Sequence, residues 1–247
     1  MIVWVLAGFL VFALLLLNSM CRRIELPRTL SFEGIEPPGV VQAFDYMSRL
    51  PPFKIIRRLF INELNRYRPT GTLVDVGCGP GYLIVLIAKK FPSLQIIGMD
   101  IAQNMVNAAT RNITARGLAK RVDFRQGDIH HLPFNDGTLD FVVSTLALHH
   151  WEHPSQALRE IHRVLNPGGQ FLIYDFRRDA LGLVKWFLRF ITNRIAPKPL
   201  RLVNEPFGSL LSAYTPEEVL TFLKDTPFRH LQVKPSVAWM FIWGQRR

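Results

Sequence analysis

Cysteine is scarce in this chain, with two residues among 247. Two cysteines cannot form a disulfide framework, and no group of cysteines and histidines has the spacing of a zinc site. Charged residues make up only 20% of the chain, and the 16 glycines and 17 prolines are too few for a collagen-like or wholly disordered protein. The length suits one α/β domain with an appendage and is sufficient to bury a full core.

Acidic residues are also few: 19 stand against 30 lysines and arginines, which gives a formal net charge of +11. A basic chain raises the question of nucleic-acid binding. Here the basic residues are spread along the chain, and no nucleic-acid-binding motif is present. We therefore expect no nucleic-acid partner.

The first 21 residues contain no charged side chain, and residues 2–17 are almost entirely apolar. Twenty helical residues span about 30 Å, the thickness of a bilayer's hydrocarbon core. A cleavable signal peptide is the alternative, but it normally has basic residues before the apolar run and a small-residue cleavage site after it. Neither is present, and Arg22 and Arg23 end the run. The sequence predicts a transmembrane anchor over residues 1–21.

The basic residues that flank this segment, Arg22, Arg23 and Arg28, all lie on its C-terminal side. That side is cytoplasmic by the positive-inside tendency, so we expect a single-pass membrane protein with its globular part in the cytoplasm. Prolines and glycines are frequent between residues 26 and 39. They predict a linker over residues 22–39, followed by one domain over residues 40–247.

Strand-like and helix-like patterns alternate through the centre of this domain, after two short helices divided by Pro51 and Pro52. The expected strands are Thr72–Val76, Gln95–Met99, Arg121–Arg125, Leu139–Ser144 and Gln170–Asp175, and the expected helices are Tyr82–Phe91, Gln103–Arg116 and Pro154–Leu165. A further helix is expected after the N-cap Thr215, followed by two antiparallel strands, 229–234 and 237–244. This alternation predicts an α/β fold with a parallel sheet, helices on both faces and a ligand beyond the carboxyl ends of the strands.

A glycine-rich loop, VDVGCGPG over residues 74–81, joins the first of these strands to the next helix. Glycine lets the backbone turn tightly and approach a ligand closely. A dinucleotide site, the mark of a nucleotide-dependent oxidoreductase, would need a G-x-G-x-x-G pattern, but Tyr82 stands where its third glycine belongs. Asp75 in this loop would repel a pyrophosphate and suits a ligand with an ammonium or sulfonium charge.

Two more acidic residues follow the next two strands. Asp100 ends the second strand, where a carboxylate is placed to accept hydrogen bonds from ribose hydroxyls. Asp128 follows the third strand, where its side chain can bond an adenine amino group while Ile129 packs on the ring. Acids at three successive strand ends indicate a binding site at that edge of the sheet.

These motifs, with LREIHRVLNPGGQFLIYD over residues 158–175, make residues 71–175 resemble the class I S-adenosyl-L-methionine-dependent methyltransferases, above all the branch with ubiquinone/menaquinone-type and sterol-type C-methyltransferases. The resemblance implies a Rossmann-like fold with a seven-stranded, mostly parallel sheet, S-adenosyl-L-methionine as cofactor and a small or lipid-like substrate. The cofactor-binding residues that it implies are Asp75, Gly77, Cys78, Gly79, Gly81, Asp100, Ile101, Met105, Asp128, Ile129 and Ser144. The alternative is a catalytically idle relative that serves as a membrane-tethered scaffold.

Methyl transfer from a sulfonium requires alignment of the acceptor and exclusion of water, and a base only where the acceptor must lose a proton. His149 and His150, after the fourth strand, are the candidates for such a base, and a packing role is the alternative. His130 and His131 are expected to be structural or solvent-exposed. Glu152 is the only carboxylate near this loop, so the sequence predicts no metal.

Residues 177–214 form an insert in which basic and aromatic residues interleave. Within it, residues 180–195 have the spacing of an amphipathic helix. One interpretation is a helix that lies on an anionic membrane surface. The other is a lid helix that buries its apolar face in the core and leaves its basic face solvated.

Overall fold

The computed structural model describes residues 21–30 and 38–247. The predicted anchor, except for Cys21, lies outside these residues, as does part of the predicted linker. Within the described ranges, no helix has both the length and the apolar character needed to cross a membrane.

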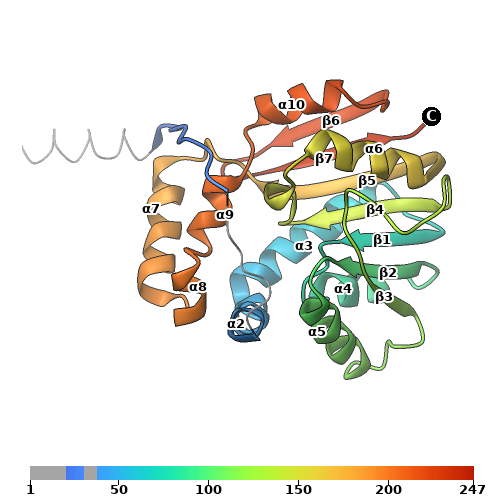
Figure 1. Cartoon of the computed structure of the whole chain (residues 1–247), viewed down its shortest axis with the longest axis horizontal. Helices are drawn as coiled ribbons and strands as arrows, with labels where there is room; N and C mark the ends of the chain where they lie inside the picture. The colour runs from blue at the N-terminus through green and yellow to red at the C-terminus, as the bar shows by residue number, and fades with distance from the viewer. Residues whose placement is uncertain (1–20, 31–37) are drawn as a thin grey trace, which may run out of the picture.

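Seven strands form one sheet in the order β3-β2-β1-β4-β5-β7-β6 (Figure 1). Their bounds are β1 Thr72–Val76, β2 Gln95–Asp100, β3 Val122–Gln126, β4 Leu139–Thr145, β5 Leu165–Phe176, β6 His230–Pro235 and β7 Trp239–Gln245. Strands β1 to β5 pair in parallel, whereas β7 is antiparallel to both β5 and β6. The predicted mostly parallel sheet of seven strands is confirmed, with strand ends within one to two residues except at the start of β5.

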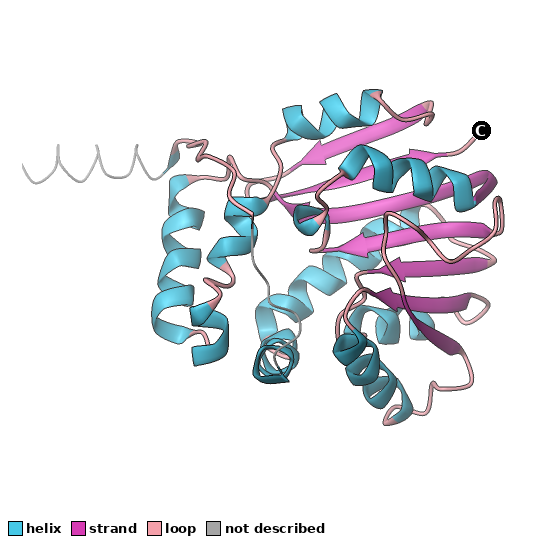
Figure 2. Cartoon of the chain, in the orientation of Figure 1, coloured by secondary structure: helices cyan, strands magenta, loops and turns pink. Residues whose placement is uncertain are grey.

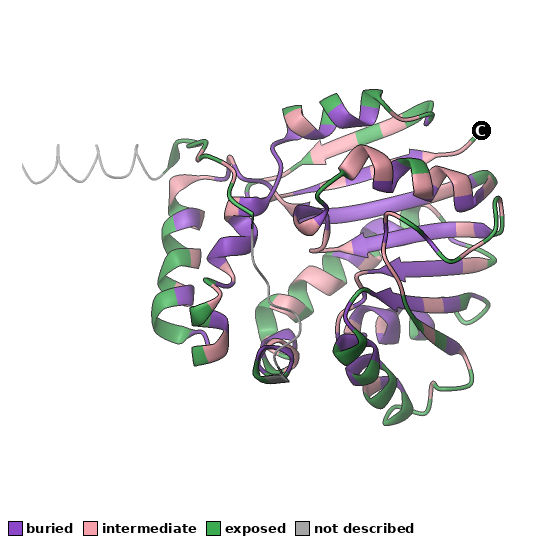
Figure 3. Cartoon of the chain, viewed as in Figure 1, coloured by how far each residue is buried: buried purple, intermediate pink, exposed green. Residues whose placement is uncertain are grey.

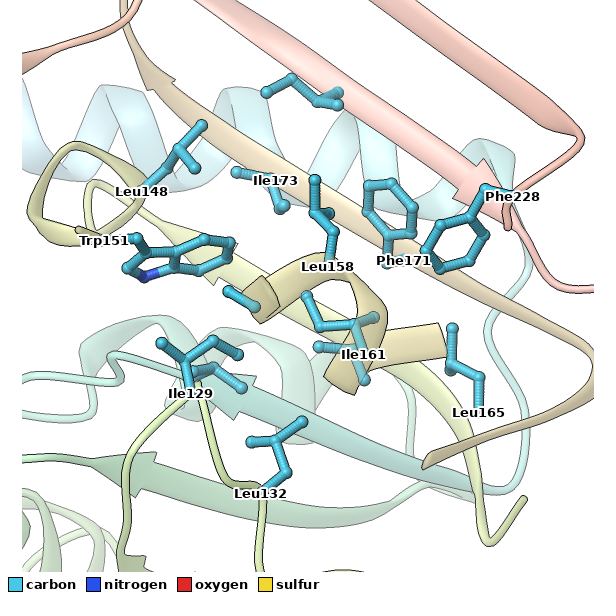
Figure 4. Packing of buried hydrophobic residues seen from close by; sticks show 14 of the residues in the cluster. Ile129, Leu132, Leu148, Trp151, Leu158, Ile161, Leu165, Phe171, Ile173 and Phe228 are labelled. Atoms are coloured by element: carbon cyan, nitrogen blue, oxygen red, sulfur yellow. The ribbon is translucent and has the colours of Figure 1, made fainter. Parts of the chain in front are cut away.

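Helices cover both faces of this sheet (Figure 2). One face packs against α3 (Pro51–Arg66), α4 (Tyr82–Lys90) and α5 (Gln103–Thr114), and the other against α6 (Pro154–Val164) and α10 (Pro216–Lys224). The second of these cores, with Ile161 and Phe171 among its members, is shown in Figure 4. Neighbouring residues of β4 point to opposite cores, as the period of two in a strand requires: Val142 to one, Phe141 and Val143 to the other.

Local signals fix the start of α10. The Thr215 hydroxyl accepts a hydrogen bond from Glu218 N at 3.2 Å, and the Glu218 carboxylate accepts one from Thr215 N at 2.8 Å. This is a capping box, with Pro216 in the first turn where its missing N–H costs nothing. The predicted N-cap is confirmed.

The remaining helices lie beyond the carboxyl ends of the parallel strands (Figure 1). They are α2 (Pro38–Ser48), α7 (Gly182–Phe190), α8 (Lys198–Leu202) and α9 (Phe207–Ser212), with a π-helical turn over Ile191–Ile195. The predicted linker needs correction at both ends. Its last two residues begin α2, and its early part is bonded to the domain, because Arg28 donates to the carbonyl of Ser212 at 2.8 Å.

The structure agrees with the lid-helix interpretation of residues 180–195 only in part. Helix α7 packs Val184 and Leu188 against a buried cluster with Phe207 and Leu210, but it also buries Lys185, which is 6% exposed, and leaves Trp186 and Phe187 more than half exposed. The sequence spacing identified an amphipathic helix, but it did not determine which side meets the core.

Candidate functional site

A cavity of about 380 Å³ opens at the carboxyl ends of β1, β2 and β4, beneath α2 and α3. Of the eleven predicted cofactor-binding residues and the two candidate base histidines, ten line this cavity: Asp75, Gly77, Cys78, Gly79, Asp100, Ile101, Met105, Asp128, Ile129 and His150. Gly81, Ser144 and His149 do not line it. The expectation that a ligand binds beyond the carboxyl ends of the parallel strands, which we call the strand-end rule, therefore located the cavity. The three residues that do not line it have specific structural reasons.

The glycine loop forms the floor of the cavity. Gly77 N and Cys78 N donate to the carbonyl of Met99 at 2.8 and 3.0 Å, which ties the loop to β2. Gly77 has a φ of 72°, and a Cβ built there would lie 2.6 Å from the Cβ of Ala147. Only glycine combines that backbone angle with that approach. Gly81 is the left-handed N-cap of α4 and packs against Ala109, so its role is structural.

The Asp100 carboxylate holds this loop from the next strand. It accepts hydrogen bonds from Gly79 N at 2.9 Å and from Ala102 N at 3.0 Å, and the residue is 7% exposed. Two backbone donors fix the position of a carboxylate that still lines the cavity. This arrangement is suited to a ligand that presents hydroxyl donors.

Asp75 is buried at the inner end of the cavity and 1% exposed. Its Oδ1 has no hydrogen-bond partner among the described residues. Burial, together with the nearby Asp100 carboxylate, raises the pKa of Asp75 well above its usual value. An unpartnered buried carboxylate that lines a cavity is a strong attractor for a cationic ligand, because the cation restores the ionised form.

We expect Asp75→Asn to stabilise the ligand-free protein while weakening its affinity for a cationic ligand. The raised pKa means that ionisation of Asp75 opposes folding. The destabilisation that this ionisation causes is absent below the pKa of Asp75 in the unfolded chain, about 3.9. It grows as pH rises from there through the higher pKa of Asp75 in the folded protein. The stability difference between Asp75→Asn and wild type is therefore expected to increase from pH 4 upward. Denaturant unfolding across that pH range measures it; equal stabilities at every pH would contradict the assignment.

Asp128 and His130 form a pair at another wall of the cavity. His130 N donates to Asp128 Oδ1 at 2.9 Å, and His130 Nδ1 lies 2.8 Å from the same oxygen. Although burial opposes ionisation, these bonds lower the pKa of Asp128. His130, predicted to be structural or exposed, therefore lines the cavity and holds the carboxylate, while Ile129 adds an apolar surface beside it.

The two histidines after β4 have different surroundings. His149 is 1% exposed; its Nδ1 lies 2.8 Å from Asp175 Oδ1, and its backbone N donates to Asp175 Oδ2 at 2.9 Å. His150 lines the cavity, with its ring 4.0 Å from that of His149. Of the two histidines, only His150 can contact a ligand in the cavity. His149 packs against the His150 ring and is itself bonded to Asp175.

Ser144 also turns away from the cavity. The residue is fully buried, and its hydroxyl donates to the carbonyl of Val76 at 2.8 Å. It therefore links the ends of β4 and β1, which is a structural contact and not a cofactor contact.

The sequence analysis missed the wall supplied by α2 and α3. Phe44, Phe53 and Ile56 make this wall apolar, and Arg57 places a half-buried guanidinium in it. Burial lowers the pKa of Arg57, whose guanidinium carbon lies 5.4 Å from the Tyr82 ring centre. No motif marks these residues, because they come from helices outside the strand-end loops. Asp175 was within reach of the strand-end rule, since it stands near the end of β5.

The described residues contain no group of three or more histidine, cysteine or carboxylate side chains that could hold a metal ion. The lining of the cavity combines the Asp75 carboxylate, which suits a cationic ligand, the Asp100 carboxylate, which suits hydroxyl groups, the Asp128–His130 pair and an apolar wall.

Comparisons with known proteins agree with this arrangement. Residues 74–173 match the family model of the methyltransferase domain. The chain is 27% identical over 194 residues to a ubiquinone/menaquinone biosynthesis C-methyltransferase of Geotalea daltonii, covering 77% of this chain and 81% of that protein. It is 31% identical over 150 residues to a demethylmenaquinone methyltransferase of Thermus thermophilus, covering 61% and 66%. The fold is similar to that of an S-adenosylmethionine-dependent methyltransferase from Aquifex aeolicus, with a TM-score of 0.61, 22% identity and coverage of 85% and 99%.

Proposed function

Because this protein is a class I S-adenosyl-L-methionine-dependent methyltransferase, we propose that its methyl acceptor is a small, lipophilic molecule of the quinone type. The names of the Geotalea and Thermus relatives support this class of acceptor. The apolar wall of Phe44, Phe53 and Ile56 carries the proposal, because it gives an acceptor with a hydrophobic ring a surface to pack on.

The cavity fits the cofactor. Asp75 offers an unpartnered buried carboxylate to a positive charge, Asp100 offers carboxylate oxygens to ribose hydroxyls, and the absent side chain of Gly77 leaves room for close approach. We assign Asp128 and Ile129, which line the same cavity, to the adenine end. When bound, S-adenosyl-L-methionine supplies an activated methyl group for in-line transfer to the aligned acceptor.

His150 is the residue that we assign to proton removal. Methylation of a ring carbon or hydroxyl releases a proton, and an imidazole accepts one near neutral pH. His150 lines the cavity beside Trp151 and Glu152, so it is within reach of an acceptor. The buried Asp175 carboxylate fixes the neighbouring His149 ring, against which His150 packs, and thus limits the movement of His150.

We also propose that the protein works at the cytoplasmic face of a membrane. The apolar sequence of residues 1–20 supports an anchor, and Arg22 and Arg23 support its orientation. Residues 180–195 are a second candidate for contact with the bilayer. A membrane location would bring the cavity close to a lipophilic acceptor.

The test is transfer of a labelled methyl group by the full chain to reduced quinones, with phenols and amines as competing acceptors. We expect His150→Gln to lower the transfer rate by about 10²-fold or more and to leave cofactor affinity unchanged, because general-base assistance contributes about 10²–10⁴. His153→Gln, an exposed histidine three residues away, is the matched control and is expected to retain full activity. Retained activity in His150→Gln, or labelling of amines alone, would overturn the respective assignment.

A further inference from the structure

Helix α7 presents an apolar face to the outside of the molecule. Leu183, Trp186, Phe187 and Phe190 are 47%, 57%, 52% and 44% exposed, and their spacing puts them on one side of the helix. The rings of Trp186 and Phe190 are stacked, with centres 5.8 Å apart. We call these four residues the aromatic face. Helix α7, labelled in Figure 1, lies at the left of the same view in Figure 3, where much of it is coloured as exposed.

Basic side chains lie on the same helix as the aromatic face and on the segment that follows it. Arg189 is exposed on α7 itself, and Arg194, Lys198 and Arg201 are exposed on the segment that follows. None of the four makes an ion pair with a carboxylate of the described residues. We call these four residues the basic rim; Arg189 also lies 5.9 Å from the ring centre of Phe207. Exposed aromatic rings next to exposed basic groups without carboxylate partners fit the interfacial region of an anionic bilayer, where rings sit at headgroup level and basic groups meet lipid phosphates.

The chain enters the described structure beside this helix. The carbonyl of Arg22 accepts a hydrogen bond from Gly182 N at 3.0 Å, and Arg23 pairs with Leu181 in an isolated β-bridge. The first turn of α7 is therefore fastened to the residues that directly follow the apolar segment of the sequence. The aromatic face therefore starts next to Arg22 and Arg23.

We propose that the aromatic face docks on an anionic lipid bilayer, as a second contact beside the N-terminal segment; the inference rests on the membrane location proposed above. A second copy of the chain is a poorer occupant. Two such faces would bring their basic rims together in a chain whose net charge is already +11. A bilayer satisfies both features, because it accepts the rings and neutralises the rim.

Docking of α7 on a bilayer would also determine which side of the cavity faces the bilayer. Ala196, just before α8, and Leu200, within α8, pack against Val40, Ala43 and Met47 of α2. The same helix α2 contributes Phe44 and Ser48 to the wall of the cavity. The segment that follows α7 thus packs on the helix that lines the cavity, so a bilayer docked on α7 would lie on the side of the molecule where α2 forms the proposed acceptor wall.

The test uses the full chain on vesicles of phosphatidylcholine with phosphatidylglycerol, in which brominated acyl chains quench nearby tryptophan fluorescence. The chain has five tryptophans, so Trp186→Phe is compared with wild type and with a control variant, Trp243→Phe. Trp243 belongs to β7, and its ring stacks on that of Tyr67, with ring centres 5.1 Å apart. We expect the quenched part of the emission to shrink in Trp186→Phe and to remain unchanged in Trp243→Phe. Arg189→Glu combined with Arg194→Glu is expected to reduce quenching at Trp186.

Equal quenching in wild type and Trp186→Phe would overturn the proposal. So would shielding of Trp186 from aqueous acrylamide in the absence of vesicles, because it would mean that the chain's own N-terminal segment or a second copy covers the face. Fluorescence requires no methyl transfer. A protein that docks but does not methylate quinones would therefore contradict the proposed acceptor and leave the docking intact.

Discussion

Asp100→Ala is expected to weaken the binding of S-adenosyl-L-methionine by about 100-fold, which corresponds to about 2.7 kcal/mol. The carboxylate has two functions that the variant loses together. In the proposed site it offers charged acceptors to the ribose hydroxyls, and in the structure it holds the glycine loop through Gly79 N at 2.9 Å. Hydrogen bonds to a charged group contribute about 1.5–3 kcal/mol each, and the loop would lose its fixed position as well. Isothermal titration of the cofactor into the full chain measures the effect.

Asp128→Ala is the variant for comparison, because it removes the carboxylate that we assign to the adenine end of the same cavity. The Asp128 side chain is 44% exposed and is already bonded to His130, so we expect a loss of less than about 10-fold. Thermal unfolding of both variants separates loss of binding from loss of folding. A loss of less than about 10-fold in folded Asp100→Ala would contradict the role assigned to Asp100.

Arg178→Ala is expected to lower the free energy of unfolding by about 3 kcal/mol. The Arg178 side chain is 4% exposed and donates to both carboxylate oxygens of Glu218, at 2.8 and 2.7 Å. It also donates to the carbonyls of Leu26 and Ala213, at 2.8 and 2.7 Å. Removing the guanidinium takes this donor away from the two carbonyls and from Glu218 Oε1, whereas Glu218 Oε2 keeps its bond from Thr215 N. The figure is at the low end of the range for a buried pair, because the Glu218 side chain is 39% exposed and water can compensate for part of the loss.

Arg66→Ala provides the contrast for this prediction. Arg66 pairs with Glu63 at 3.2 Å, but its side chain is 70% exposed, and such surface pairs contribute less than about 1 kcal/mol. Denaturant unfolding of the two variants in parallel measures the difference. A loss in Arg178→Ala no greater than that in Arg66→Ala would contradict the structural role assigned to the buried guanidinium.

Much of the fold follows from local signals in the sequence. Strand β1 and the capping box of α10 lie where the apolar pattern and the Thr215–Glu218 pair place them. The N-terminal end of β5 was missed, because Asn166 to Gly169 has the composition of a turn, and yet pairing extends the strand back to Leu165 opposite Leu139.

The cavity residues likewise fall into those that the sequence marks and those that only packing brings to the cavity. A glycine that must adopt a positive φ and acids at the ends of parallel strands are marked by residue type and position, so Gly77, Asp75 and Asp100 were identified from the sequence alone. Arg57 and the apolar wall carry no such mark, since their importance arises only from the way α2 and α3 pack over the strand ends.

The sequence by itself determined the elements, their alternation and the cofactor loop, because these depend on backbone preferences and on the period of apolar residues. The tertiary structure decided which side of each element faces inward. It turned His150 toward the cavity and His149 toward Asp175, although the two residues are adjacent. It likewise turned Lys185 inward and Trp186 outward. Periodicity defines two faces of a helix or turn, and only the packing of the rest of the chain selects the one that is buried.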